Sequence, residues 1–282
     1  MGVPTPIKDK RGATRRSSMP PLQNPVEEAA RIIDAADAGG VVLRLFGGVS
    51  FWFRCPSAKN PPLQRKYVDV DLMGHTKQSK DIKQLFVSLD YIPRDKFNAM
   101  QGYRRLIFND MANQRRVDVF LDVFEMCHSF NFRDRLEVDA RTIPLADMLV
   151  TKIQIIDVNE KDLKDAICLF IDHDVGSGDG EMINGAYVAN LCASDWGIYK
   201  TFTMNLDRLL AKLGDLSLED DVKASVRGRV NKLRTMIEDK PKDFRWKMRA
   251  RIGEKVKWYE LPEADKEVVD SRMVSDAAQP KS

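Results

Sequence analysis

Two short stretches decide how this chain folds: "VVLRLFGGVSFWF" at 41–53 and "RKYVDVDLMG" at 65–74. Each contains an apolar run that is typical of a strand. The first run ends in a glycine pair, and the second carries Asp69 and Asp71, one residue apart. Because residues i and i+2 of a strand point to the same face of a sheet, we expect these two carboxylates to lie side by side.

Two neighbouring carboxylates repel each other unless a cation lies between them. Mg²⁺ prefers such hard oxygen ligands, with Mn²⁺ as the alternative ion. Asp118, in "RRVDVFLD", would add a third carboxylate if its strand lies antiparallel beside the strand that carries Asp69 and Asp71. Three carboxylates on adjacent strands suffice for two metal ions about 3.5–4 Å apart. Asp122 is the rival candidate for the third ligand.

The glycine pair, Gly47 and Gly48, stands where a strand passes into a predicted helix. Glycines at such a turn allow the backbone to approach a phosphate, and the helix presents its N–H groups there. The Ser50 hydroxyl would add a further donor. We therefore predict phosphate binding at residues 47–50.

The pattern along the chain predicts four parts: a disordered basic tail (1–23), a core domain (24–144), an all-helical domain (145–260) and a disordered tail (261–282). In the core domain, strands are expected at 41–46, 66–73, 103–110 and 115–124, the last two forming a hairpin. Asn24 and Asn159 are expected to cap helices, and continuous helix is expected over 183–238. The fold class is α/β (α+β): a mixed sheet with flanking helices, followed by a helical domain.

Bulk properties place the chain among globular proteins. It has 282 residues, of which 43% are hydrophobic and 31% charged. No apolar run reaches the roughly 18 residues that a membrane span needs, and the first residues lack the apolar segment of a secretory signal. Four scattered cysteines read as reduced thiols, so we expect a cytoplasmic protein with no membrane partner.

Charge is unevenly distributed. The chain has a net charge of +3, whereas residues 221–258 carry thirteen Lys and Arg against five Asp and Glu, a net charge of +8. Aromatic residues are interleaved with the basic ones: Phe244, Trp246, Trp258 and Tyr259. Aromatic rings stack on unpaired bases while cations follow the phosphates, so this block predicts nucleic-acid contact. The alternative is a packed helix whose charges face water.

The order of these motifs resembles the nucleotidyltransferase fold shared with DNA polymerase beta, and most closely the AbiEii-type toxin nucleotidyltransferases. The resemblance covers about residues 27–172. It rests on the strand ending in Gly47-Gly48, on Arg65 with the two aspartates that follow, and on Asp118. Lys152 in "LVTKIQI" and the "EKDLKDAICLF" helix, with Asp162 and Asp165, continue it. Tyr67 stands where that family usually has Thr or Ser.

The resemblance implies a metal-dependent transfer of a nucleoside monophosphate from an NTP to a hydroxyl group. The acceptor would be an RNA 3′ end, a protein side chain or a small alcohol. Asp69, Asp71 and Asp118 would be the catalytic metal ligands. The NTP would be bound by Gly47, Gly48, Ser50, Arg65 and Lys152. A toxin of this kind would have a cognate antitoxin as partner. The alternative is a nucleotide-binding protein that keeps the fold with weak or no catalysis.

Overall fold

The computed structural model describes residues 19–260, which form two compact units. Unit 1 comprises the chain up to Lys59, then Gln64–Asp122 and Arg133–Pro144. Unit 2 comprises Asn60–Leu63, Val123–Phe132 and the chain from Leu145 onward. The final passage from unit 1 to unit 2 therefore falls at Pro144.

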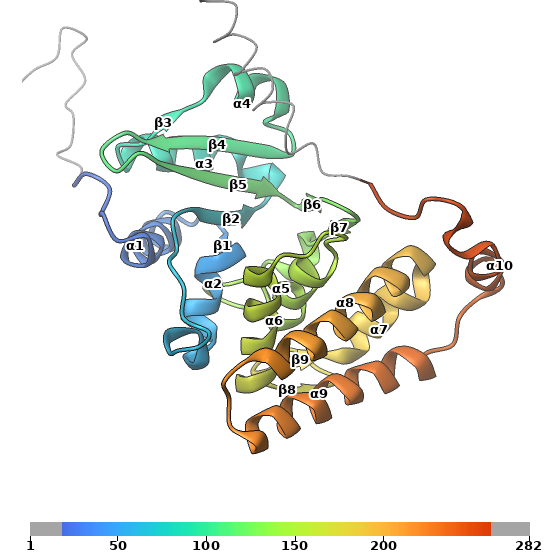
Figure 1. Cartoon of the computed structure of the whole chain (residues 1–282). Coiled ribbons are helices and arrows are strands. Elements are labelled where there is room, and N and C mark those ends of the chain that lie inside the picture. Colours follow the sequence, from blue (N-terminus) through green and yellow to red (C-terminus); the bar gives the residue numbers. More distant parts are fainter. Residues whose placement is uncertain (1–18, 261–282) are drawn as a thin grey trace, which may run out of the picture. The chain divides into compact units, whose positions relative to one another are not determined.

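Unit 1 is built on a five-stranded mixed sheet (Figure 1). The strand order is β1-β2-β5-β4-β3, and every neighbouring pair is antiparallel except β2 and β5, which are parallel. The predicted hairpin is confirmed as β4 and β5. The strands are β1 (Leu43–Phe46), β2 (Val70–Gly74), β3 (Ile92–Pro93), β4 (Arg105–Asp110) and β5 (Arg115–Leu121).

Helices α1 and α3 supply the apolar side chains that cover one face of this sheet. Ile32 and Ile33 of α1 and Phe86 of α3 are buried in one cluster with alternate residues of the strands. The helices of unit 1 are α1 (Pro25–Ala38), α2 (Gly47–Arg54), α3 (Ser79–Ser88) and α4 (Asp95–Gln101), with 3₁₀ turns at Pro56–Lys59, Thr76–Gln78 and Arg133–Arg135.

The alternation of the strands sorts their residues between this core and the opposite face. Val70 and Leu72 of β2, like Val117 and Val119 of β5, belong to the buried cluster. The residues between them must point to the other face because successive side chains alternate. That second face consequently carries the acidic residues of both strands.

Helix α1 begins as the sequence predicts. The Asn24 side chain accepts a hydrogen bond from the backbone N–H of Val26, and Pro25 occupies the first helical turn. Of the predicted disordered tail 1–23, residues 1–18 lie outside the described part. The end of that segment is ordered, because Asn113 and Arg115 donate side-chain hydrogen bonds to the carbonyl of Leu22.

Unit 2 is mainly helical, with two short strand pairs that the sequence did not predict. Asn159 caps α6 as expected. The helix expected over 183–238 is instead three helices, because Asp195 caps a new helix and residues 216–219 are not helical. The helices are α5 (Leu145–Ile153), α6 (Glu160–Asp172), α7 (Gly185–Ser194), α8 (Trp196–Asp215), α9 (Asp220–Asp239) and α10 (Phe244–Ile252), with a 3₁₀ turn at Gly253–Lys255. The strands are β6 (Val123–Glu125) with β7 (Ser129–Asn131), antiparallel, and β8 (Asp174–Gly176) with β9 (Met182–Asn184), parallel.

The structure also bears on the predictions about membrane spans and cysteines. Within residues 19–260, no helix has both the length and the apolar character needed to cross a membrane. All four cysteines are free thiols, as the sequence predicts, and the structure adds that all four are buried. The predicted tail at 261–282 lies outside the described residues.

Candidate active site

Asp71 and Asp118 lie next to each other on the face of the sheet that turns away from the core. They are direct partners in the ladder between β2 and β5. On the other side of β2, Asp71 is paired with Phe46, the last residue of β1. The end of β1, Asp71 and Asp118 therefore occupy consecutive positions across three strands.

The sequence-based expectation of an antiparallel neighbour is wrong. Strand β5 runs parallel to β2, because α3, β3, α4 and β4 lie between them in the chain and return it in the same direction. Paired residues of neighbouring strands share a face in either direction. The adjacency of Asp71 and Asp118 therefore survives the change of strand direction.

The glycine turn follows β1 directly, and α2 begins at Gly47. Gly47 has a φ of 64°, a left-handed conformation that favours glycine. A Cβ at this position would overlap the Asp71 carboxylate, and one at Gly48 would overlap the guanidinium of Arg65. Both glycines thus make room for side chains of the predicted site.

Arg65 lies between the glycine turn and Tyr67, in the segment before β2. Its guanidinium lies close to Gly48 and is 4.7 Å from the ring centre of Tyr67. The N-cap residue of α2 is Phe46, whose side chain makes no capping hydrogen bond. A helix N-terminus without a side-chain cap, next to a guanidinium, is a favourable position for an anionic group.

Ser50 is placed differently from the other predicted nucleotide contacts. Its side chain is fully buried, and its hydroxyl donates a hydrogen bond of 2.8 Å to the carbonyl of Gly47. The hydroxyl therefore stabilises the first turn of α2. Contact between Ser50 and a phosphate stays a prediction.

The carboxylate of Asp118 is buried and compensated by two arginines. Arg105 of β4 lies 2.8 Å from Oδ1, and Arg116 of β5 lies 2.8 Å from Oδ2. Arg105 also stacks over the ring of Phe120, at 4.8 Å. The sequence contained a signal for Arg116, which stands two residues before Asp118 and so shares its face. It had none for Arg105, whose approach depends on the register between β4 and β5.

Asp69 is exposed and lies one residue before β2 begins. Within the described residues, no three Asp, Glu, His or Cys side chains are gathered as a metal ion would need. The carboxylates of Asp69, Asp71 and Asp118 nevertheless fit a divalent cation in kind, being hard oxygen donors on neighbouring positions. For all three to share a cation, Asp69 must turn inward and Asp118 must release its arginines.

Asp122, the rival third ligand, has another role. It follows β5 with a φ of 57°, and its carboxylate lies 3.0 Å from Nδ1 of His75. It also accepts a hydrogen bond from the backbone N–H of Thr76 and pairs with Arg133 at 3.2 Å. Burial opposes ionisation of this carboxyl, but these hydrogen bonds and the Arg133 charge outweigh it and lower its pKa. Asp122 thus joins three segments of unit 1.

Lys152 belongs to α5 of unit 2 and is buried. Its ammonium lies 2.7 Å from the Asp162 carboxylate and 3.0 Å from that of Asp165, both in α6. Burial alone would lower the pKa of Lys152, but the two carboxylates raise it above the usual lysine value. The sequence offered the helix dipole as the reason for the two aspartates, and the structure adds that they are counterions of Lys152. A role of Lys152 in phosphate binding stays a prediction.

Comparison with known proteins gives no match among families and a low-identity similarity among solved structures. No family model and no curated protein matches the chain. Among solved structures, the chain is similar to the STING-associated CdnE c-di-GMP synthase from Capnocytophaga granulosa, with 14% identity, over 77% of this chain and 80% of that one, at a TM-score of 0.27.

Proposed function

We propose that this protein is a nucleotidyltransferase that moves a nucleoside monophosphate from an NTP to a hydroxyl acceptor. The observation that carries the proposal is the pairing of Asp71 with Asp118, directly beside the glycine turn that opens α2. Carboxylates beside a phosphate-binding turn are the parts that metal-assisted phosphoryl chemistry requires.

Each residue then has a defined task. Asp69, Asp71 and Asp118 would hold two Mg²⁺ or Mn²⁺ ions, which when bound would activate the attacking hydroxyl and stabilise the leaving oxygen. The backbone of Gly47 and Gly48 lets the triphosphate approach the start of α2. The Arg65 guanidinium, beside Gly48, neutralises part of the triphosphate charge. Pyrophosphate leaves as the new phosphodiester bond forms.

The acceptor we propose is an RNA 3′ end or a protein hydroxyl. The order of the motifs also supports a toxin of the AbiEii type that is controlled by a cognate antitoxin. This part of the proposal rests on the sequence resemblance alone.

A second function is favoured by a specific observation. The Asp118 carboxylate is compensated by Arg105 and Arg116, which occupy the oxygens that a cation would use. A protein in which these ion pairs persist would bind a nucleotide without transferring it. It would act as a nucleotide-binding partner.

The test is a labelling experiment. Purified protein is incubated with each labelled NTP, total RNA and Mg²⁺, and the labelled product is identified. We expect Asp71→Asn and Asp118→Asn each to reduce labelling by about 100-fold or more, because each removes several kcal/mol of charge stabilisation. Asp81→Asn, an exposed carboxylate of α3, is the matched control and should label normally. NTP binding without any labelled product would favour the second function.

A further inference from the structure

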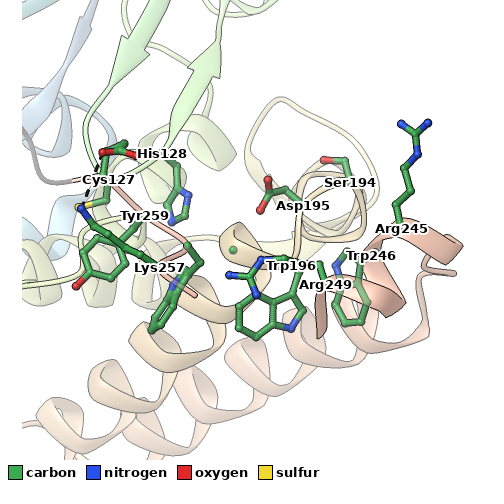
Figure 2. A pocket seen from close by; sticks show the side chains of 13 residues that line it. Cys127, His128, Ser194, Asp195, Trp196, Arg245, Trp246, Arg249, Lys257 and Tyr259 are labelled. Carbon is green, nitrogen blue, oxygen red and sulfur yellow. Dashed lines mark ion pairs between the residues drawn. The ribbon is translucent and has the colours of Figure 1, made fainter. Parts of the chain in front are cut away.

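Unit 2 contains a pocket of about 500 Å³ that the proposed chemistry does not use (Figure 2). Four segments of unit 2 form it: the turn between β6 and β7, the junction of α7 and α8, helix α10, and the extended chain 257–260. Three of the four tryptophans of the chain line it, together with one tyrosine: Trp196, Trp246, Trp258 and Tyr259. The pocket is therefore lined by several flat aromatic rings.

Hydrogen bonds from the ring nitrogens hold two of the indoles in position. The indole N–H of Trp246 donates to the carbonyl of Cys192 at 2.8 Å, and that of Trp258 donates to the hydroxyl of Thr201 at 3.1 Å. Trp196 meets the Trp258 ring edge to face, with ring centres 6.0 Å apart. Rings that are fixed in this way form a stacking surface that loses little entropy when a ligand binds.

Positive charge lies at both ends of this surface. Figure 2 shows Lys257 at one end of the pocket and Arg245 at the other, with Trp196 between them. Arg245 is exposed and makes no ion pair or hydrogen bond with any described residue. Lys257 forms a long, exposed ion pair with Glu260, at 3.9 Å, which an anionic ligand can replace. Both cations can therefore take an anionic ligand.

The remaining charged groups of the pocket already have structural partners. Arg249 donates hydrogen bonds to the carbonyls of Gly253 and Val256 and stacks on Trp196 at 4.5 Å. Asp195 caps α8 by accepting a hydrogen bond from the N–H of Ile198. These two residues shape the pocket, and the cationic groups at its ends are Arg245, which is unpaired among the described residues, and Lys257, whose ion pair with the exposed Glu260 is long.

We propose that this pocket binds single-stranded nucleic acid, with bases stacked on the indole rings and phosphates at Arg245 and Lys257. Separation of the two cations by aromatic surface suits a strand of more than one nucleotide better than a single nucleotide. Base stacking on aromatic side chains and cations along the backbone are the two contacts that such strands require. If the bound strand is RNA, it would be the acceptor of the proposed reaction. Only this acceptor role rests on the proposed function; the binding of a strand does not.

The test measures tryptophan fluorescence in a Trp52→Phe background, so that only the three indoles of the pocket report. The background also carries Asp71→Asn, and the buffer contains a chelator, which removes any contribution from divalent ions. The probes are an oligouridylate RNA, the matching deoxyribose oligomer and UMP. We expect the RNA to quench fluorescence, with an affinity that falls linearly with the logarithm of salt concentration.

Two variants locate the binding. Arg245→Gln should weaken binding and reduce the salt slope by about 0.7, since it removes one phosphate contact to a single strand. Arg251→Gln, an exposed arginine of the same helix outside the pocket, is the matched control and should change neither. Trp258→Leu should weaken binding about tenfold through the lost stacking. Thermal unfolding of each variant confirms that it is folded.

Every outcome bears on the proposal. Binding of both oligomers, or of the RNA alone, supports it and identifies the strand. Binding of UMP with the same affinity as the oligomer overturns the assignment to a strand. Absence of quenching, or equal effects of Arg245→Gln and Arg251→Gln, overturns the pocket as the site. RNA that binds here but receives no nucleotide in the labelling experiment leaves the pocket standing and removes RNA as the acceptor of the proposed function.

Discussion

At the scale of single residues, Gly47 and Gly40 have similar φ angles and can be compared directly. Gly47 has a φ of 64° and Gly40 a φ of 68°, but a Cβ would meet the Asp71 carboxylate only at Gly47. We predict that Gly47→Ala lowers NTP affinity in the presence of Mg²⁺ by about tenfold or more, because it displaces a carboxylate of the site. Calorimetric titration measures this.

Gly40→Ala is the matched control for this prediction. Both substitutions place alanine in the left-handed region and should cost about 1–2 kcal/mol of stability. Nothing lies within 4 Å of a Cβ at Gly40, so its NTP affinity should stay at the wild-type value. Equal NTP affinity of both variants would show that Asp71 does not contribute to the site.

Removing an arginine that pairs with Asp118 should strengthen binding at the site, whereas Gly47→Ala should weaken it. Arg116 is half-exposed and lies 2.8 Å from the Asp118 carboxylate, so it competes with any cation there. We predict that Arg116→Gln strengthens Mn²⁺ binding roughly two- to fivefold, the range expected for the loss of one partly exposed ion pair. Titration of the protein with Mn²⁺, followed by calorimetry, measures this change.

Arg141→Gln provides the comparison. Arg141 is equally exposed and pairs at 2.7 Å with Asp34 of α1, which is not a carboxylate of the site. It should leave Mn²⁺ affinity unchanged. Weaker Mn²⁺ binding by Arg116→Gln would mean that the arginine organises the carboxylate and does not compete for it.

At the scale of elements, α5 and α6 are joined by a buried ion triad. Lys152 lies between Asp162 and Asp165, and its removal leaves two carboxylates in a buried position. We predict that Lys152→Met destabilises the protein by about 3–5 kcal/mol. Lys164→Met, which breaks an ion pair with the exposed Glu160, should cost far less, because solvent screens that pair. Denaturant unfolding of both variants gives the comparison.

The difference in stability between wild type and Lys152→Met depends on pH because the pKa of Lys152 is raised. A cation whose pKa is higher in the folded state stabilises the fold fully below its unfolded value, which is 10.5. That contribution is lost as pH rises through the folded-state pKa. The stability gap between wild type and Lys152→Met should thus be constant near neutral pH and shrink only above about pH 10.5. A gap that shrinks near pH 7 would contradict the triad.

At the scale of the whole molecule, the cysteines report on each unit separately. Cys55 lies in unit 1, whereas Cys127, Cys168 and Cys192 lie in unit 2, and all four are buried. Burial also raises the pKa of the Cys192 thiol. We predict that alkylation of Cys55, Cys168 and Cys192 is at least about a thousandfold slower in native buffer than in denaturant. Mass spectrometry of the labelled peptides measures each rate.

Cys127 is the internal comparison because it lines the pocket of unit 2. It should react first among the four thiols, and bound oligonucleotide should slow it. Rapid native labelling of Cys168, which lies inside α6, would show that unit 2 opens more readily than its packing indicates.

The sequence by itself determined the features that depend on neighbouring residues. Asn24 and Asn159 cap helices where they were predicted, because a cap is a contact over three residues. The glycine turn opens α2 as expected, and Asp71 faces away from the core because strand alternation is a local property. The sheet of unit 1 and the largely helical unit 2 follow from the same short-range patterns.

Only the tertiary structure decided the contacts between segments that are distant in the chain. The parallel pairing of β2 with β5, the two arginines on Asp118 and the counterions of Lys152 have no short-range signal. The sequence also did not predict the helix break at Asp195. This break forms one wall of the pocket, and α10 and residues 257–260 form others. Strand direction, charge compensation and burial depend on which elements meet, and that is set by the balance of packing and desolvation over a whole unit.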